Sequence, residues 1–171
     1  MIRKNLENLP EIPTLPYGYK LRIYKEGDEE NWCNIINKSC GANFDIEKFI
    51  SEFKRHPSFS PNRIFFIDYK ETSVATSMAW KDSPEEKITG RIHWVGVLEE
   101  HRGKGLGYII TLRCLYRLKE EGLKNCYLIT QNYRIPAIKM YLKLGFEPEV
   151  IDENFNVWKE VFEKLGIMFS L

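Results

Sequence analysis

The sequence predicts a single mixed α/β or α+β domain built on one central sheet, and three observations support this. The chain has 171 residues, which is enough for one domain with a buried core. Its apolar residues recur at helical spacing in some segments and alternate as in strands in others. These segments follow in the order strand, two helices, three strands, helix, strand and helix, which is typical of a mixed sheet covered by helices.

The chain opens with an arm, residues 1–18, that shows no regular period. It contains three of the eight prolines, and we expect it to pack loosely outside a domain that spans residues 19–171. Residues 19–24 alternate polar and apolar side chains, which predicts the first strand.

Two helices, a hairpin and a third strand of similar length follow. The apolar spacing predicts helices over residues 27–41 and 45–56. Residues 63–69 and 72–80 are rich in β-branched and aromatic side chains and are separated by a short polar turn, so they predict a hairpin. Residues 89–97 predict one more strand.

The second half predicts two helices, one strand and a tail of open structure. Apolar residues that recur every four positions predict a helix over residues 105–121. Residues 125–130 form a short apolar run, typical of a buried strand, and residues 135–146 predict a short helix. Residues 153–166 fit either a helix or a strand followed by a helix.

The start of the helix at 105–121 is unusual because Gly103, Gly105 and Gly107 stand there in place of a Ser, Thr, Asp or Asn cap. A helix start offers unpaired N–H groups and partial positive charge, and glycine lets an anion approach the backbone closely. Arg102 and Lys104 add formal positive charge. The stretch therefore predicts a phosphate or pyrophosphate cradle, with a plain glycine-rich turn as the alternative.

Two familiar nucleotide-binding loops do not fit this stretch. No Lys-Ser or Lys-Thr pair closes it, so it is not a P-loop. Its spacing is G-x-G-x-G, it comes late in the chain, and the next strand ends in Thr130 and Gln131 rather than in an acid. These features disfavour a dinucleotide-binding fingerprint.

Composition excludes several other classes. The net charge of +1 gives no general attraction to nucleic acid or to an anionic membrane. The first residues lack the apolar core of a signal peptide, and no run approaches a membrane span. The cysteines lack metal-ligand spacing, so we expect reduced thiols, no metal and a cytoplasmic protein. They are Cys33, Cys40, Cys114 and Cys126.

Two motifs in the expected order resemble the GNAT family of CoA-dependent N-acyltransferases. In VLEEHRGKGLG, residues 97–107, the family loop R/Q-x-x-G-x-G/A is met by Arg102, Gly105 and Gly107. About thirty residues later, AIKMYLKLGF resembles the family pattern A-I-x-x-Y followed by G-F. The resemblance implies a central mixed sheet, flanked by helices, in which two neighbouring parallel strands splay apart.

The resemblance also implies that acetyl-CoA is the co-substrate and that it lies between the splayed strands. Backbone groups of Val95 and Val97 would pair with the pantetheine amides, and the N–H groups of residues 102–107 would hold the pyrophosphate. The family often has an Asn where this chain has Arg134, and Asn132 is carried over as a cofactor contact or as a helix cap. The residues expected at the co-substrate are Val95, Gly96, Val97, Arg102, Gly103, Lys104, Gly105, Leu106, Gly107 and Asn132.

Two residues are the candidate catalytic groups. The resemblance implies that Tyr141 protonates the departing thiolate, a role that its phenol suits. Some group must also take a proton from the amine, and His93 is the first candidate. Because strand side chains alternate, we expect His93 on the same face as Val95 and Val97. A water chain and the carboxylates of residues 99 and 100 are the alternatives.

The function predicted is transfer of an acyl group from acyl-CoA to a primary amine by direct attack in a ternary complex. Acetyl is the acyl group that we expect. The acceptor is a small-molecule amine or a peptide amine. The alternative is a sensor or interaction module that binds acyl-CoA without transferring the acyl group. A nucleotide-phosphate or nucleic-acid binder is the third option, which the balanced charge disfavours. Apolar residues in the tail leave a homodimer open.

Overall fold

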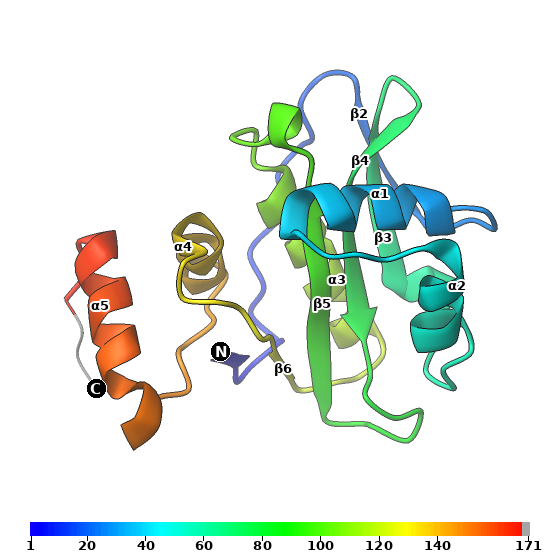
Figure 1. The fold of residues 1–171 in the computed structure, drawn as a ribbon. Coiled ribbons are helices and arrows are strands. Elements are labelled where there is room, and N and C mark those ends of the chain that lie inside the picture. Colours follow the sequence, from blue (N-terminus) through cyan, green and yellow to red (C-terminus); the bar gives the residue numbers. More distant parts are fainter. Residues whose placement is uncertain (169–171) are drawn as a thin grey trace.

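A computed structural model describes residues 1–168 and contains one six-stranded sheet with the order β1-β6-β5-β4-β3-β2 (Figure 1). Neighbouring strands are antiparallel except for β5 and β6, which are parallel. The predicted mixed sheet is therefore confirmed. The strands are β1 Ile2–Arg3, β2 Tyr19–Ile23, β3 Ile64–Tyr69, β4 Thr72–Trp80, β5 Thr89–Val97 and β6 Asn125–Tyr127.

The helices cover both faces of this sheet. In Figure 1, α1 and α2 lie on one face and α3 on the other, while α4 and α5 lie beyond β6. Each face has its own buried apolar cluster. The helices are α1 Glu29–Cys40, α2 Ile46–Phe49 (continued by a π-helical turn, Ile50–Lys54), α3 Leu106–Glu120, α4 Ile135–Lys143 and α5 Phe155–Leu165. The tail, left open by the sequence, is helical up to Leu165, and the last three residues of the expected domain lie outside those described.

The parallel strands β5 and β6 pair over only part of their length. Thr89–Arg91 pairs with Asn125–Tyr127, after which β5 continues to Val97 without β6 beside it. The strand expected over residues 125–130 covers only Asn125–Tyr127, and beyond it the Leu128 N–H still bonds to the Met1 carbonyl (2.9 Å), on the edge of β6 that faces away from β5. The expected splay is confirmed, and it leaves a gap between β5 and the chain that follows β6.

The N-terminal arm does not pack loosely, so that expectation is wrong for its first residues. β1 pairs with β6, and the Met1 amino group donates a hydrogen bond to the Leu128 carbonyl (3.0 Å). Leu6 is only 1% exposed and belongs to the cluster under α3. The arm covers the outer edge of β6, whose unpaired backbone groups would otherwise be exposed.

A β-bulge interrupts β5 just before the gap. Thr76 of β4 lies opposite Gly96, whereas Met78 lies opposite His93, so β5 contains one residue more than β4 over this interval. The bulged residue Trp94 has a φ of +50°, which is uncommon for a residue other than glycine. An extra residue reverses the alternation of side chains, so residues before and after the bulge face opposite ways from those in a regular strand.

Candidate active site

The loop between β5 and α3 owes its shape to two glycines. After a turn of 3₁₀-helix at Glu99–His101, Gly103 has a φ of +76° and Gly105, the N-cap of α3, a φ of +78°. A Cβ at either position would meet nothing within 4 Å. These two glycines are therefore needed for the backbone conformation, not for lack of space.

Most backbone N–H groups of this loop have no acceptor among the described residues. The first bond of α3 runs from the Ile109 N–H to the Gly105 carbonyl (3.0 Å). Within residues 1–168, the N–H groups from Gly103 to Tyr108 bond to no protein group. The Arg102 N–H is bound to the Glu99 carbonyl (3.1 Å), so the expectation that it joins the cradle is wrong. The run of unpaired N–H groups therefore starts at Gly103.

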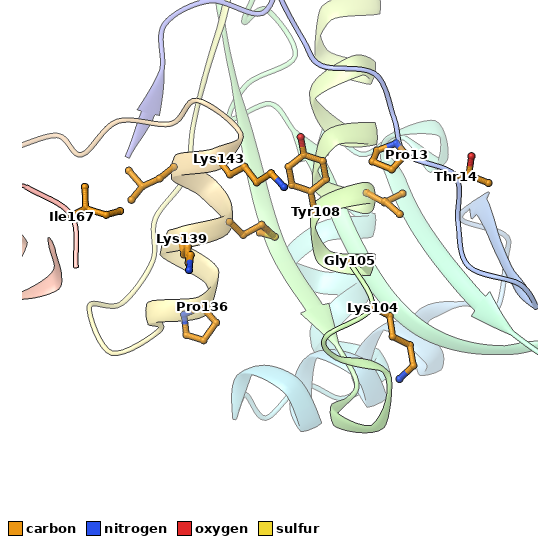
Figure 2. Close-up of a pocket in the computed structure, with 12 residues that line it drawn as sticks. Pro13, Thr14, Lys104, Gly105, Tyr108, Pro136, Lys139, Lys143 and Ile167 are labelled. Carbon is orange, nitrogen blue, oxygen red and sulfur yellow. The ribbon is translucent and has the colours of Figure 1, made fainter. Parts of the chain in front are cut away.

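A cavity of about 800 Å³ opens beside this helix start, between α3, α4 and the N-terminal arm (Figure 2). Lys104, Lys139 and Lys143 line it, and none of its lining residues is acidic. Lys143 Nζ also lies 5.2 Å from the centre of the Tyr108 ring. A cavity of this size, with cationic and apolar walls, suits a multiply charged anion that also has an apolar part.

The third glycine has a different function from the first two. A Cβ at Gly107 would lie 3.3 Å from Met140 Sδ of α4 and 3.7 Å from Val97 Cγ2 of β5. Gly107 therefore permits α3 to approach α4 and β5 closely. The N-terminal turn of α3 is fixed between the strand and the helix that border the gap.

The end of β5 turns backbone groups toward the gap. The Leu98 N–H bonds to the Val74 carbonyl of β4 (2.9 Å), so the alternating pattern directs the groups of Val97 away from β4. The Val97 carbonyl accepts a hydrogen bond from Arg102 Nε (3.2 Å). The predicted position of Val97 beside a ligand in the gap therefore fits, with its carbonyl already contacted by the chain itself.

Val95 and Gly96 differ in their surroundings. The Val95 carbonyl accepts a hydrogen bond from Cys40 Sγ (3.5 Å), at the end of α1. Gly96 faces α1, where a Cβ would lie 2.5 Å from Ser39 Oγ. Gly96 thus allows α1 to pack against the sheet, and its side chain position does not border the gap.

Tyr141 has a buried ring and a free hydroxyl. Its residue is 7% exposed, and its ring lies edge to face with that of Phe146 at 5.9 Å. No group in the described chain forms a hydrogen bond with the hydroxyl. Burial raises the pKa of Tyr141, as does Cys40, while the positive charge of Arg134 acts in the opposite direction. The phenol is therefore protonated at neutral pH and can donate its proton.

His93 does not lie where the sequence placed it. Because of the bulge, His93 is on the α1 and α2 face, with the rings of Phe53 (5.8 Å) and Trp80 (6.3 Å), while Val97 packs against the cluster under α3. The expectation of a shared face is wrong. Burial, followed by the nearby charge of Arg91, lowers the pKa of His93 to about 3. Its role as a base stays a prediction, which so low a pKa disfavours.

The remaining candidates occupy exposed positions. Asn132 lies in the turn before α4, is exposed and forms no hydrogen bond within residues 1–168. The side chains of Glu99 and Glu100 are exposed as well. The sequence analysis did not single out Lys139 and Lys143, although their spacing of four residues on one helix places them on one face.

Three further properties concern the described part of the chain. Residues 1–168 contain no group of three or more His, Cys, Asp or Glu side chains placed to hold a metal ion. The helices among these residues are all too short or too polar to cross a membrane. Burial raises the pKa of the Cys114 thiol to about 12, which agrees with its expected place in the core.

The mixed sheet has parallel strands that part beside a helix start with unpaired N–H groups, which is the arrangement expected of the class of N-acyltransferases. The chain belongs to the acetyltransferase (GNAT) family, whose model matches residues 29–146. The resemblance inferred from the two sequence motifs is thereby confirmed.

Curated relatives include several mycothiol acetyltransferases. That of Nocardia farcinica is 37% identical over 157 residues, which cover 84% of this chain and 50% of the relative. That of Actinosynnema mirum is 27% identical over 150 residues, covering 85% and 50%. The chain thus spans about half the length of these relatives.

Solved structures share the fold at lower identity. A GCN5-related N-acetyltransferase from Sphaerobacter thermophilus gives a TM-score of 0.72 with 19% identity, covering 85% of this chain and 46% of the other. The ribosomal-protein-S18-alanine N-acetyltransferase from Escherichia coli gives 0.65 with 14% identity, covering 77% and 79%. At these identities the likeness concerns the fold alone.

Proposed function

We propose that this chain transfers an acyl group from acyl-CoA to the primary amine of a small molecule, by direct attack in a ternary complex. Acetyl is the acyl group that we expect. One observation carries the proposal: the N–H groups from Gly103 to Tyr108 are unpaired at the start of α3. An array of this kind binds phosphate groups, which CoA carries as a pyrophosphate and a separate phosphate. Membership of the acetyltransferase family supports the choice of CoA.

The cavity and the gap together provide a path for acyl-CoA. The pyrophosphate binds the loop amides, and Lys104, Lys139 and Lys143 neutralise the remaining charge. The pantetheine arm then follows β5, where Val97 turns backbone groups away from β4. The thioester reaches the hydroxyl of Tyr141 on the other side of the gap.

Each proton in the reaction needs a donor or an acceptor. An alkyl amine must lose its proton before it attacks, because at pH 7 only on the order of one molecule in a thousand is neutral. We assign this proton to water, since His93 is buried among rings and its pKa is low. When the carbon–sulfur bond breaks, the sulfur takes the bonding electron pair and a proton from Tyr141.

The acceptor is inferred at the level of its class. The curated relatives are called mycothiol acetyltransferases, which supports a small-molecule amine as acceptor here. Because this chain spans about half their length, peptide amines belong in the same test.

The test is an assay of thiol release. The purified chain is mixed with acetyl-CoA and a panel of small-molecule amines and amino-terminal peptides, and free CoA thiol is measured. Acetyl-CoA should also raise the melting temperature, since a ligand of the native state stabilises it. Binding without thiol release from any amine would support the non-catalytic module instead. A chain that neither binds acetyl-CoA nor releases thiol would contradict the proposal.

A further inference from the structure

Two arginines, Arg102 after β5 and Arg134 before α4, bind the C-terminal end of α1. Arg134 Nη2 donates a hydrogen bond to the Cys40 carbonyl (3.0 Å), and Arg102 Nη2 contacts the Ser39 carbonyl at 3.5 Å. Cys40 is the last residue of α1. The carbonyls of a helix end lack partners within the helix and carry partial negative charge, which a cation stabilises. In Figure 1, α1 crosses β4 and β5, and its cyan end lies on the side of α4.

Arg134 differs from Arg102 in its surroundings. Arg102 is exposed, whereas Arg134 is partly buried at the N-cap of α4. Arg134 Nε is itself buried and has no hydrogen-bond partner in the part of the chain that the structure describes. A buried donor without a partner costs free energy, so an arginine held in this way needs a reason. Within residues 1–168 no carboxylate forms an ion pair with Arg134, and its guanidinium lies 5.6 Å from the centre of the Tyr133 ring.

Arg134 and Tyr141 share one side of α4. The two residues are seven positions apart, about two helical turns, and therefore lie on the same side of α4. The hydroxyl of Tyr141 forms no hydrogen bond within residues 1–168, and Arg134 is the cation whose positive charge acts on it. Burial raises the pKa of Tyr141, and Arg134 lowers it.

We propose that Arg134 is a positioning residue for acyl transfer: it holds the end of α1 against α4 and presents a fixed positive charge to the hydroxyl of Tyr141. The proposal rests on the proposed function. As the carbon–sulfur bond breaks, the sulfur takes the electron pair and the proton of Tyr141, which becomes a phenolate. Arg134 stabilises that phenolate. The amine nitrogen, now bonded to the acyl carbon, still carries one surplus proton, which passes through water and restores the phenol, while the proton that left before the attack goes to the solvent. The family residue at this position, Asn, carries no charge.

The first test measures the coupling without any turnover. Residue 141 is replaced by 3,5-difluorotyrosine, whose phenol is more acidic than that of tyrosine, and its ionisation is followed by ¹⁹F NMR. In Arg134→Gln, which removes the charge, the midpoint should rise by about one pH unit. Arg113→Gln is the control, because Arg113 is paired with Glu120 on α3, and it should leave the midpoint unchanged. An unchanged midpoint in folded Arg134→Gln overturns the proposal.

A second variant covers the case in which Arg134→Gln does not fold. Arg134→Asn restores the residue that the family often has there, and its midpoint should rise in the same way. If the midpoint does not rise in Arg134→Asn, the proposal is wrong.

The second test uses the reaction. Arg134→Gln should lower kcat by tenfold or more, change the KM for acetyl-CoA less than threefold and raise the upper pKa of the kcat profile, while Arg134→Lys should recover part of the rate. A purely structural role would lower stability and leave that pKa in place. If the wild-type chain releases no thiol, the proposed function fails, but the ¹⁹F titration still decides whether Arg134 acts on Tyr141.

Discussion

The two faces of the sheet differ in the side chains and backbone groups that they place next to the gap between β5 and the chain after β6. On the α3 and α4 face, the loop amides from Gly103 to Tyr108 are unpaired, and three lysines surround a cavity. On the α1 and α2 face, aromatic rings fill the space: Trp94 packs against Phe44 at 5.1 Å and against Trp32 at 5.9 Å. One face is open and cationic, and the other is closed and apolar.

This difference separates two tasks of the molecule. In the proposed function, the loop recognises an anion, because its exposed donors are held in place by backbone geometry. The aromatic face instead fixes β5 and its bulge, and it keeps His93 neutral because a charged imidazole would be buried there. Tyr141 and Arg134 lie on α4, between these two regions, and there the positive charge of Arg134 acts on the buried phenol.

The largest effect should come from Tyr141→Phe, which removes a donor and little else. If Tyr141 supplies the acid, kcat should fall about 100-fold or more, while the KM for acetyl-CoA changes little. Steady-state thiol release measures both. Tyr116→Phe is the control, because the Tyr116 hydroxyl only binds the Pro10 carbonyl at 3.1 Å, on the arm. Equal rates in the wild type and Tyr141→Phe would remove Tyr141 from this role.

The next effect concerns the open face and compares Gly105→Ala with Gly122→Ala. Both glycines have a φ near +80° (+78° and +83°) and open space around an added Cβ. Each change should therefore cost a similar roughly 1–2 kcal/mol of stability. Only Gly105 lies in the proposed anion site. Only Gly105→Ala should therefore weaken the binding of acetyl-CoA, by about tenfold or more, because the charge-assisted hydrogen bonds from the loop N–H groups to the phosphates are lost.

Calorimetric titration gives the affinities, and thermal unfolding gives the stabilities. If Gly122→Ala weakens the binding of acetyl-CoA as much as Gly105→Ala does, the anion is not bound at the start of α3.

The open face was largely predictable from the sequence, and the closed face was not. Glycines between basic residues before an apolar helical stretch already indicate a backbone anion site, because Gly103 and Gly105 act through local geometry. The same holds for the hairpin turn at Lys70 and Glu71, where two positive φ values join β3 to β4. Local chemistry leaves a local trace.

Long-range competition leaves no such trace. The bulge at Trp94 moved His93 to the other face, and the residue with the positive φ there is a tryptophan rather than a glycine. β6 pairs with β5 only as far as Tyr127, while its other edge pairs with residues at the start of the chain, including Met1 with Leu128. The contact between Arg134 and Cys40 joins residues 94 positions apart, on two helices that sequence reasoning treats separately.

A third prediction tests the closed face through its dependence on pH. The pKa of His93 is about 3 in the folded chain, below its unfolded value near 6.5. The unfolded state therefore binds the proton more tightly, so the stabilisation is complete above about pH 6.5 and is lost as the pH falls toward 3. This one group contributes a slope of up to about 1.4 kcal/mol per pH unit.

His93→Leu should flatten that part of the stability profile, measured by urea unfolding between pH 4 and 7. In the same variant, the shape of the kcat profile above pH 6 should not change. A rate that is lost near neutrality and recovers in alkali would instead identify His93 as the base.

The smallest effect distinguishes charge from backbone on the open face. Lys139 lines the cavity, whereas Lys124, just before β6, is equally exposed and lies outside the cavity lining. An exposed charge contributes less to the binding free energy than a set of oriented amides does, so Lys139→Gln should weaken the binding of acetyl-CoA only about threefold at low salt. The loss should shrink further at high salt, because the interaction is screened. Lys124→Gln should have no effect, and equal losses in the two variants would mean that the net charge of the chain, rather than the cavity, attracts the anion.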